Sequence, residues 1–133
     1  KKSGVSFGTK KAKYFNDDGL TSLQQKIKWS DVVAIGPGLG REAETVNAVR
    51  RFLLEKKFKF AVIDADAIFA LDKIFLEKVD FKNCILTPHL GEFSQMVGVE
   101  SNLIEKDILS YGKAFAIKYK CILVLKGANV LTT

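Results

Sequence analysis

Four short turns in this chain carry residue types that can bind or convert a small molecule. Each turn follows a short apolar run of the kind that forms a β-strand, and the turns are Gly36–Gly40, Asp64–Asp66, Thr87–His89 and Lys126–Gly127. In an open α/β sheet, ligands bind at the edge where the carboxyl ends of the strands lie. The sequence therefore predicts a small-molecule site along one edge of a sheet.

The first turn, Gly36-Pro37-Gly38-Leu39-Gly40, stands between a predicted strand and a predicted helix. Glycines let the backbone approach a ligand closely, and a helix N-terminus offers free N–H groups and the positive end of its dipole. This arrangement suits a phosphate or a carboxamide. A tight turn that needs glycine only for its φ angles fits the same residues. The spacing matches neither a Walker loop nor the GxGxxG fingerprint.

Asp64 and Asp66 end the second apolar run. Alternate residues at a strand end can point to the same side, so both carboxylates can face a ligand or an ion. In the alternative interpretation, Asp66 caps a helix that starts at Ala67 and Asp64 accepts backbone N–H groups. We favour capping for Asp66 and leave both interpretations of Asp64 open.

His89 is the only histidine of the chain and follows Thr87-Pro88 at the end of the third apolar run. Pro88 holds Thr87 in an extended conformation and ends the strand. The imidazole can stack on a ring, donate a hydrogen bond or move a proton, but a single histidine is more often structural. Glu92 lies in the first turn of the following helix, where the dipole favours a carboxylate with or without a function.

Lys126 ends the fourth long apolar run and is followed at once by Gly127. A lysine in this position can clamp a phosphate, with the ammonium and the backbone N–H acting together. A surface lysine that packs its aliphatic stem along the protein is the alternative.

The elements that would position these turns alternate between strands and helices. Apolar runs predict strands at 31–35, 58–63, 84–87 and 121–125, with further short strands around 5–7 and 130–133. Apolar residues at helical spacing predict helices at 20–28, 41–57, 67–71 continuing toward 79, 91–97 and from 101 or 102 to 119. We expect Thr21 or Ser22 to cap the first helix, after a turn at Asn16–Gly19. This order predicts an α/β fold whose mostly parallel sheet carries helices on both faces.

The composition fits one globular domain. The 133 residues are 47% hydrophobic and 27% charged, and the net charge of +6 suits anionic ligands such as nucleotides without singling them out. The basic residues are scattered, which argues against a nucleic-acid partner. The apolar runs are too short for a membrane span. Cys84 and Cys121 each begin an apolar run, which predicts buried, reduced thiols and a cytoplasmic location. No CxxC pair or histidine cluster indicates a structural metal.

Together, the four turns resemble the ADP/ATP-dependent NAD(P)H-hydrate dehydratase family of the ribokinase-like superfamily. Strand-GPGLGR, strand-DADA, LTPH-x-GEF and VLKGA occur in this order between about Asp31 and Val130. The resemblance implies a ribokinase-like three-layer sandwich. It also implies a repair enzyme that phosphorylates hydrated NADH or NADPH from ADP or ATP with Mg²⁺ and then eliminates phosphate. No residue of the chain can be named as a magnesium ligand.

The resemblance also implies the roles of individual residues. Gly38 and His89 would contact the hydrate, and the same lining would include Gly36, Gly40, Glu92 and Phe93. The residues that would hold the adenine nucleotide are Lys126, Gly127, Ala128, Asn129 and Val130. The family usually has a polar residue where this chain has Val130, so we expect one nucleotide contact to be absent.

The family's Gly-Thr-Gly-Asp segment, with its anion hole and catalytic aspartate, is expected beyond Thr133. No catalytic residue is therefore assigned within the chain, and neither Asp64 nor Asp66 is taken as a substitute. The family's glycine- and alanine-rich N-terminal part is likewise expected ahead of Lys1. We predict that residues 1–133 form a single domain, the central fragment of a dehydratase, active only as part of the full-length protein.

Two other functions fit the same residues. A ribokinase-like kinase for a sugar or vitamin precursor would share the fold, although TPH-x-GEF resembles the dehydratases more closely. A non-catalytic nucleotide-binding or oligomerisation module would bind without turnover. The sequence does not determine the choice of ADP or ATP, or whether an epimerase domain is fused upstream. A homo-oligomer is compatible with it.

Overall fold

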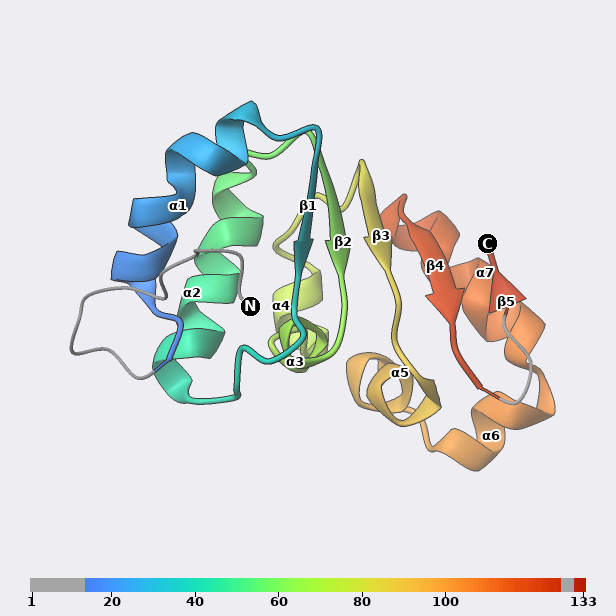
Figure 1. Ribbon diagram of the computed structural model, residues 1–133. Helices are drawn as coiled ribbons and strands as arrows, with labels where there is room; N and C mark the ends of the chain where they lie inside the picture. Colours follow the sequence, from blue (N-terminus) through green and yellow to red (C-terminus); the bar gives the residue numbers. More distant parts are fainter. Residues whose placement is uncertain (1–13, 128–130) are drawn as a thin grey trace.

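The computed structural model describes residues 14–127 and 131–133, in which five strands form one sheet (Figure 1). The strands lie in the order β1-β2-β3-β4-β5; the first four are parallel and β5 is antiparallel to β4. Their bounds are Val32–Ile35 for β1, Phe60–Ile63 for β2, Cys84–Leu86 for β3, Ile122–Leu125 for β4 and Leu131–Thr132 for β5. Because the parallel strands are adjacent in chain order, their carboxyl ends follow one another along a single edge.

Helices connect the parallel strands, as parallel pairing requires. Within the described residues they are α1 Asp17–Trp29, α2 Ala43–Glu55, α3 Asp66–Phe69, α4 Lys73–Leu76, α5 Leu90–Val97, α6 Ser101–Lys106 and α7 Ile108–Tyr119. In Figure 1 they lie behind the sheet, beside it or below its lower edge.

One face of the sheet forms the centre of the core. Successive strand residues point to opposite faces, and every second one is buried here: Ile35, Ala61, Ile63, Cys84, Leu86, Leu123 and Leu125. The thiols of Cys84 and Cys121 are free and buried, and burial raises their pKa values to about 11 and about 12. The prediction that both cysteines are buried and form no disulfide is confirmed.

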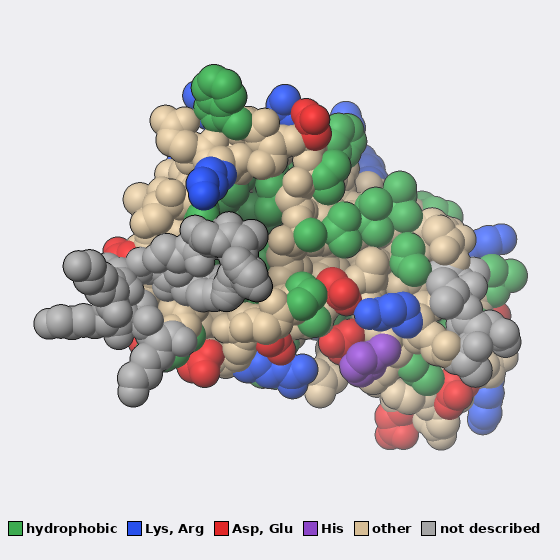
Figure 2. Space-filling model, viewed as in Figure 1, with side chains coloured by type: hydrophobic (Ala, Val, Ile, Leu, Met, Phe, Trp, Pro, Cys, Tyr) green, Lys and Arg blue, Asp and Glu red, His purple; other side chains and the backbone are tan. Residues whose placement is uncertain are grey.

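The opposite face of the sheet also carries apolar side chains. Val32 is 57% exposed, Phe60 53% and Ile122 49%, and Figure 2 shows hydrophobic side chains gathered over the strands on this side. The expected α/β class with a mostly parallel sheet is confirmed. The expected helices on both faces are seen on one face only, within residues 14–127 and 131–133. The apolar strand pattern indicates that both faces are apolar, but it does not say which segment covers each.

The first helix starts earlier than predicted. Asn16 is its N-cap and accepts a hydrogen bond from the Gly19 amide at 3.0 Å. The residues expected to form a turn are thus the cap and first turn of α1, where Asp17 and Asp18 suit the positive end of the dipole. Neither Thr21 nor Ser22 is the cap.

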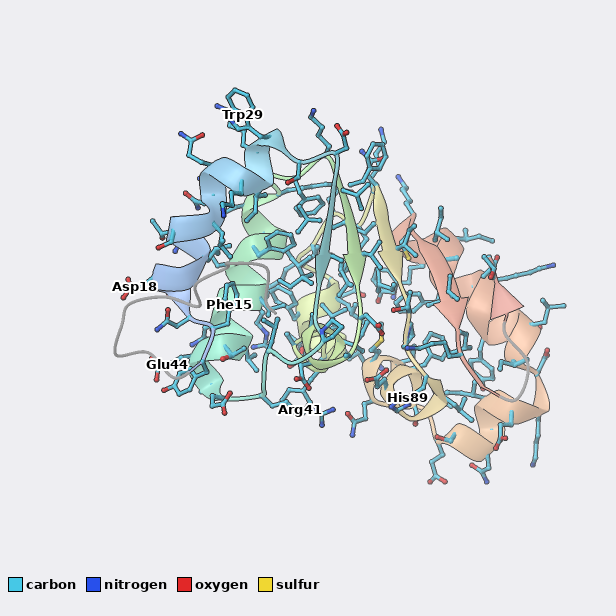
Figure 3. All side chains as sticks on the ribbon, viewed as in Figure 1. Phe15, Asp18, Trp29, Arg41, Glu44 and His89 are labelled. Carbon is cyan, nitrogen blue, oxygen red and sulfur yellow. The ribbon has the colours of Figure 1, made fainter. Side chains whose placement is uncertain are left out.

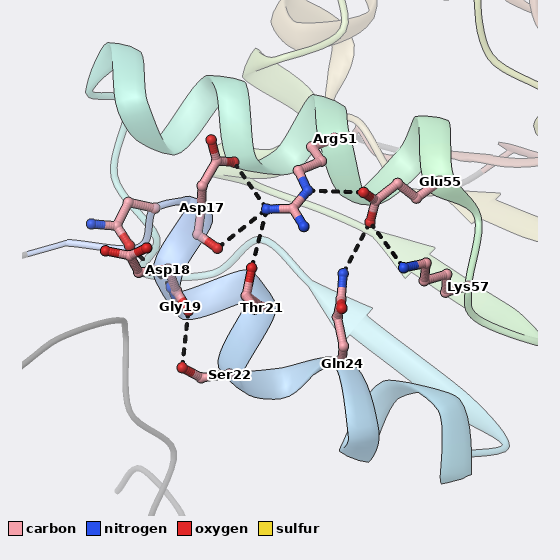
Figure 4. A network of polar contacts seen from close by, with 10 residues as sticks. Asp17, Asp18, Gly19, Thr21, Ser22, Gln24, Arg51, Glu55 and Lys57 are labelled. Carbon is pink, nitrogen blue, oxygen red and sulfur yellow. Dashed lines mark hydrogen bonds and ion pairs between the residues drawn. The ribbon is translucent and has the colours of Figure 1, made fainter.

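Polar side chains attach α1 to α2 (Figure 4). The Arg51 guanidinium donates to the Thr21 hydroxyl at 3.2 Å and to Glu55 at 2.9 Å. Glu55 also accepts from the Gln24 amide at 3.1 Å. The hydrogen bond from Arg51 lowers the pKa of Glu55 below its ordinary value, although partial burial opposes this.

Two long helical predictions are each divided in the structure. The expected helix from 101 or 102 to 119 is interrupted at Asp107 (φ −152°, ψ 60°), whose side chain accepts from the Ser110 amide at 3.3 Å and caps α7. The stretch from 67 toward 79 is divided at Asp72, which accepts from the Phe75 amide at 2.7 Å and caps α4. Apolar spacing continues across both breaks, but the aspartate side chains satisfy amides that a continuous helix would bond internally.

The remaining elements agree with the predictions to within about two residues at each end. The strand expected around 5–7 lies outside the described residues, and so does Val130 of the strand expected at 130–133. None of the described helices is long and apolar enough to cross a membrane.

Candidate active-site edge

The four turns meet at the carboxyl edge of the sheet, the lower edge in Figure 1. Backbone hydrogen bonds continue between neighbours past the strand ends. The Asp64 amide donates to the Ile35 carbonyl at 3.0 Å, the Thr87 amide to Ile63 at 3.1 Å, and the Lys126 amide to Pro88 at 2.9 Å. His89 and Lys126 also form an isolated parallel bridge. The structure thus brings the predicted turns side by side; ligand binding there stays a prediction.

The first glycine turn lies directly against the second turn. Gly36 has φ +143°, and a Cβ atom at this position would lie 1.7 Å from the Asp64 carbonyl oxygen. Glycine is therefore required at Gly36 by the fold itself. Gly38 has φ +77°, but a Cβ there would meet nothing within 4 Å. Gly38 thus stands beside open space, as the predicted hydrate contact requires.

Asp66 does not cap α3. The helix begins at Asp66 itself, its N-cap is Ala65 and no side chain bonds there. The carboxylate instead accepts from the Gly40 amide at 2.8 Å and from Arg41 Nε at 3.2 Å. The capping prediction is wrong because the side chain turns toward the glycine turn, whose proximity depends on the pairing of β1 with β2.

Asp64 forms an ion pair with Lys126. Lys126 Nζ lies 3.0 Å from Asp64 Oδ1, which also accepts from the Ala65 amide at 2.8 Å. Burial raises the pKa of the Asp64 carboxyl, but hydrogen bonds from Lys126, Thr87 and the Ala65 amide outweigh it and hold the pKa below its ordinary value. The Lys126 side chain is 43% exposed. Its ammonium is therefore held at the edge and can still be reached by a ligand.

His89 is the N-cap of α5 and forms a capping box with Glu92. Its Nδ1 accepts from the Glu92 amide at 3.2 Å, and Glu92 Oε1 accepts from the His89 amide at 2.9 Å. The His89 side chain is 60% exposed and that of Glu92 is 12% exposed. Figure 3 shows His89 at the carboxyl end of β3, and Figure 2 shows the histidine beside acidic and basic side chains below the apolar sheet face. The residue has a structural role and remains open to a ligand.

Phe93 was expected in the substrate lining, and the structure contradicts this. Its side chain is fully buried and packs edge-on against Phe115, with ring centroids 5.3 Å apart. One helical step of about 100° separates it from Glu92 and turns it toward the core. The Phe93 side chain therefore packs α5 against α7 in the core.

The predicted nucleotide loop is described only in part. Lys126 and Gly127 lie at the edge, beyond the end of β4, while Ala128, Asn129 and Val130 lie outside the described residues. Within the described part of the chain, no three His, Cys, Asp or Glu side chains are grouped so that they could hold a metal ion. No magnesium ligand is therefore assigned.

A pocket of about 270 Å³ adjoins the edge and was not predicted. Glu92 lines it together with Arg41, Val46, Arg50, Ile68, Phe69, Leu71, Asp72 and Gln95. The Arg41 guanidinium lies 4.8 Å from the centre of the Phe69 ring, and Arg50 donates to the Ala70 carbonyl at 2.9 Å. Arg41 could have been noticed as the last residue of GPGLGR, but nothing in the sequence singles out Arg50.

The sequence profile of NAD(P)H-hydrate dehydratase matches residues 9–132. The chain belongs to the NAD(P)H-hydrate dehydratase family. This confirms the resemblance drawn from the four motifs. Among curated relatives, the bifunctional NAD(P)H-hydrate repair enzyme Nnr of Moorella thermoacetica is 37% identical over 116 residues, which cover 86% of this chain and 22% of the relative. Its counterpart in Escherichia coli is 34% identical over 112 residues, 84% of this chain and 21% of the relative.

Solved structures agree with the dehydratase assignment. The ADP/ATP-dependent NAD(P)H-hydrate dehydratase of Bacillus subtilis, co-crystallised with ATP/Mg²⁺, matches with a TM-score of 0.61 and 29% identity, over 83% of this chain and 40% of that one. A ribokinase-like superfamily protein of Enterococcus faecalis matches with a TM-score of 0.68 at 22% identity, over 86% of this chain and 39% of that one, and shows the fold alone. The chain spans about a fifth of the length of the curated relatives and about two fifths of the solved ones.

Proposed function

We propose that this chain supplies the ligand-binding edge of an ADP/ATP-dependent dehydratase that repairs hydrated NADH and NADPH. The observation that carries the proposal is the meeting of all four family motifs at one sheet edge, with the exposed His89 ring and the Lys126 ammonium on bridged residues. The family assignment supports the choice of reaction. The homologue crystallised with ATP/Mg²⁺ supports the choice of nucleotide.

In the proposed reaction the nucleotide phosphorylates the hydroxyl of the hydrate, and phosphate then leaves to restore the dihydronicotinamide. Phosphoryl transfer depends mainly on positioning and on neutralising charge. Lys126 would bind a nucleotide phosphate, with Gly127 beside it. Gly38, His89 and Glu92 would contact the hydrate, and Gly36 and Gly40 would shape the turn around it. No residue of the chain is assigned as the catalytic base, and no step is assigned to magnesium.

The proposal extends to the ligands, the assembly and the location of the protein. The ligands are the hydrate and an adenine nucleotide, ADP or ATP, without nucleic acid or membrane. A homo-oligomer and a cytoplasmic location also belong to it. A kinase for a sugar or vitamin precursor, or a module that binds nucleotide without turnover, would give a different product or none.

The test is a nucleotide-dependent repair assay on the full-length protein that contains these residues. Hydrated NADH is supplied with ADP or ATP, and the return of the absorbance of reduced nicotinamide is followed. We expect turnover, and a loss of about 100-fold in kcat/KM for Lys126→Met, because one charge-assisted phosphate contact is removed. Lys113→Met, at an exposed lysine of α7, is the matched control. Phosphorylation of a sugar without repair of the hydrate would support the kinase instead.

A further inference from the structure

The contacts of His89 determine which of its nitrogens carries the proton. The Glu92 amide donates to Nδ1 at 3.2 Å. A backbone N–H can donate only to an unprotonated ring nitrogen, so a neutral His89 must carry its hydrogen on Nε2. The capping box therefore selects one tautomer as well as starting α5.

Glu92 reinforces this choice with its side chain. Its Oε1 accepts the His89 amide at 2.9 Å and fixes the backbone on which the ring stands. Its Oε2 lies 3.6 Å from Nε2. A carboxylate on that side favours a hydrogen on Nε2, while the distance is too long for a full hydrogen bond. The Nε2–H group therefore stays available to another acceptor.

Gly91 provides the space for the ring. A Cβ atom at Gly91 would lie 3.1 Å from Cε1 and 3.3 Å from Nδ1 of His89. These contacts are tighter than nine in ten such contacts, so an alanine at this position would displace the imidazole by a few tenths of an ångström and weaken its bond to the Glu92 amide. Gly91 is the second residue of α5, and within a helix alanine is otherwise preferred over glycine by up to about 1 kcal/mol.

We propose that Glu92 and Gly91 are positioning residues that hold His89 as its neutral Nε2–H tautomer, so that it donates a hydrogen bond to an acceptor oxygen of the bound hydrate. His89 is then a donor and not the base that removes a proton. The assignment of the tautomer rests on geometry alone, whereas the identity of the acceptor rests on the proposed function. The 60% exposure of the ring leaves its donor edge accessible while the 12% exposed Glu92 anchors it.

The tautomer is tested without any ligand, by ¹⁵N NMR of the neutral imidazole in the full-length protein. His89 is the only histidine among residues 1–133, and in the full-length protein its two nitrogen signals are identified by their absence from the spectrum of His89→Asn. We expect one protonated nitrogen, Nε2, and one unprotonated nitrogen, Nδ1. Glu92→Gln should retain this pattern because its amide oxygen still accepts the His89 amide. Gly91→Ala should shift the signals toward a mixture of tautomers. Averaged signals in the wild-type chain would overturn the inference.

Gly91→Ala also separates positioning from a purely structural role. Alanine gains about 1 kcal/mol in helix propensity, while a weakened His89 cap costs up to about 1 kcal/mol, so the thermal stability of α5 should change little. A purely structural role then predicts unchanged hydrate affinity. Positioning predicts that the same variant binds the hydrate about five- to tenfold more weakly in the full-length protein, with unchanged nucleotide affinity. Lys113→Ala on α7 is the control. Wild-type affinity in Gly91→Ala would overturn the inference. If no variant, including wild type, binds the hydrate, the proposed function fails and the NMR result still decides the tautomer.

Discussion

The ammonium of Lys126 lies 3.0 Å from Oδ1 of Asp64, although 62 residues separate them in the chain. The two residues directly follow β2 and β4, which are not neighbours in the sheet, and the end of β3 lies between them. The lysine side chain therefore extends across the end of β3. The Asp64 carboxylate that it contacts also accepts a hydrogen bond from the Ala65 amide. The pair connects the turn that carries the aspartates with the predicted nucleotide loop.

Removing this pair should affect stability only slightly. Both side chains are partly exposed, at 43% and 32%, and such pairs contribute about 0–1 kcal/mol. We expect Lys126→Met to lower the free energy of unfolding in urea by no more than about 1 kcal/mol, while nucleotide affinity falls markedly. A loss of several kcal/mol would show that the lysine is structural and would remove its value as a functional probe.

The same pair predicts a dependence of stability on pH. The pKa of Asp64 is lower in the folded protein than its ordinary value of 3.8. Its contribution is therefore fully present above that ordinary value and is lost as pH falls toward the lowered folded value. Urea unfolding of the wild type and of Asp64→Asn should differ most at neutral pH, and the difference should shrink in acid below the ordinary value. A difference that stays constant or grows in acid would contradict the assignment.

His89 is expected to show two separable effects. His89→Ala removes the N-cap of α5 and should cost about 1 kcal/mol of stability. His89→Asn keeps an oxygen acceptor for the Glu92 amide and should retain most of that stability. Both variants lose the imidazole donor, so both should bind the hydrate more weakly. Calorimetric Tm values and hydrate affinities, measured on the same samples, distinguish the two effects. Full hydrate affinity in His89→Asn would leave the histidine with its capping role alone.

Gly36 is predicted to be the least tolerant glycine of the site. A Cβ 1.7 Å from the Asp64 carbonyl oxygen cannot be accommodated without moving β1 or β2. Gly36→Ala should therefore cost more than about 3 kcal/mol, or prevent folding. Gly98→Ala is the matched control, because its φ of +71° is also left-handed but its nearest neighbour, Lys73 Cδ, is 3.7 Å away. Equal melting temperatures for the two variants would refute the clash.

Much of this architecture could be predicted from local patterns. Apolar runs placed β1 to β4 to within about two residues, and glycine, proline and aspartate marked the turns that follow them. The four motifs identified the family before any contact was known. Local patterns were less reliable for helix ends. The N-cap of α1 is Asn16 and not Thr21 or Ser22, and Asp107 interrupts a helix that the apolar spacing predicted to be continuous. A single side-chain hydrogen bond decides such cases, and hydrophobic periodicity does not record it.

The sequence by itself determined the strand–turn–helix order, the chemistry of each turn and the family. Tertiary structure alone decided which partners those side chains have. Asp66 bonds the Gly40 amide because β1 pairs with β2, and Asp64 meets Lys126 because β3 holds β2 and β4 in fixed register. Phe93 was predicted to line the site, but it lies one helical step beyond Glu92 and its side chain is buried in the core. Local sequence specifies a residue's chemistry and backbone preference, whereas its neighbours depend on pairings between segments far apart in the chain.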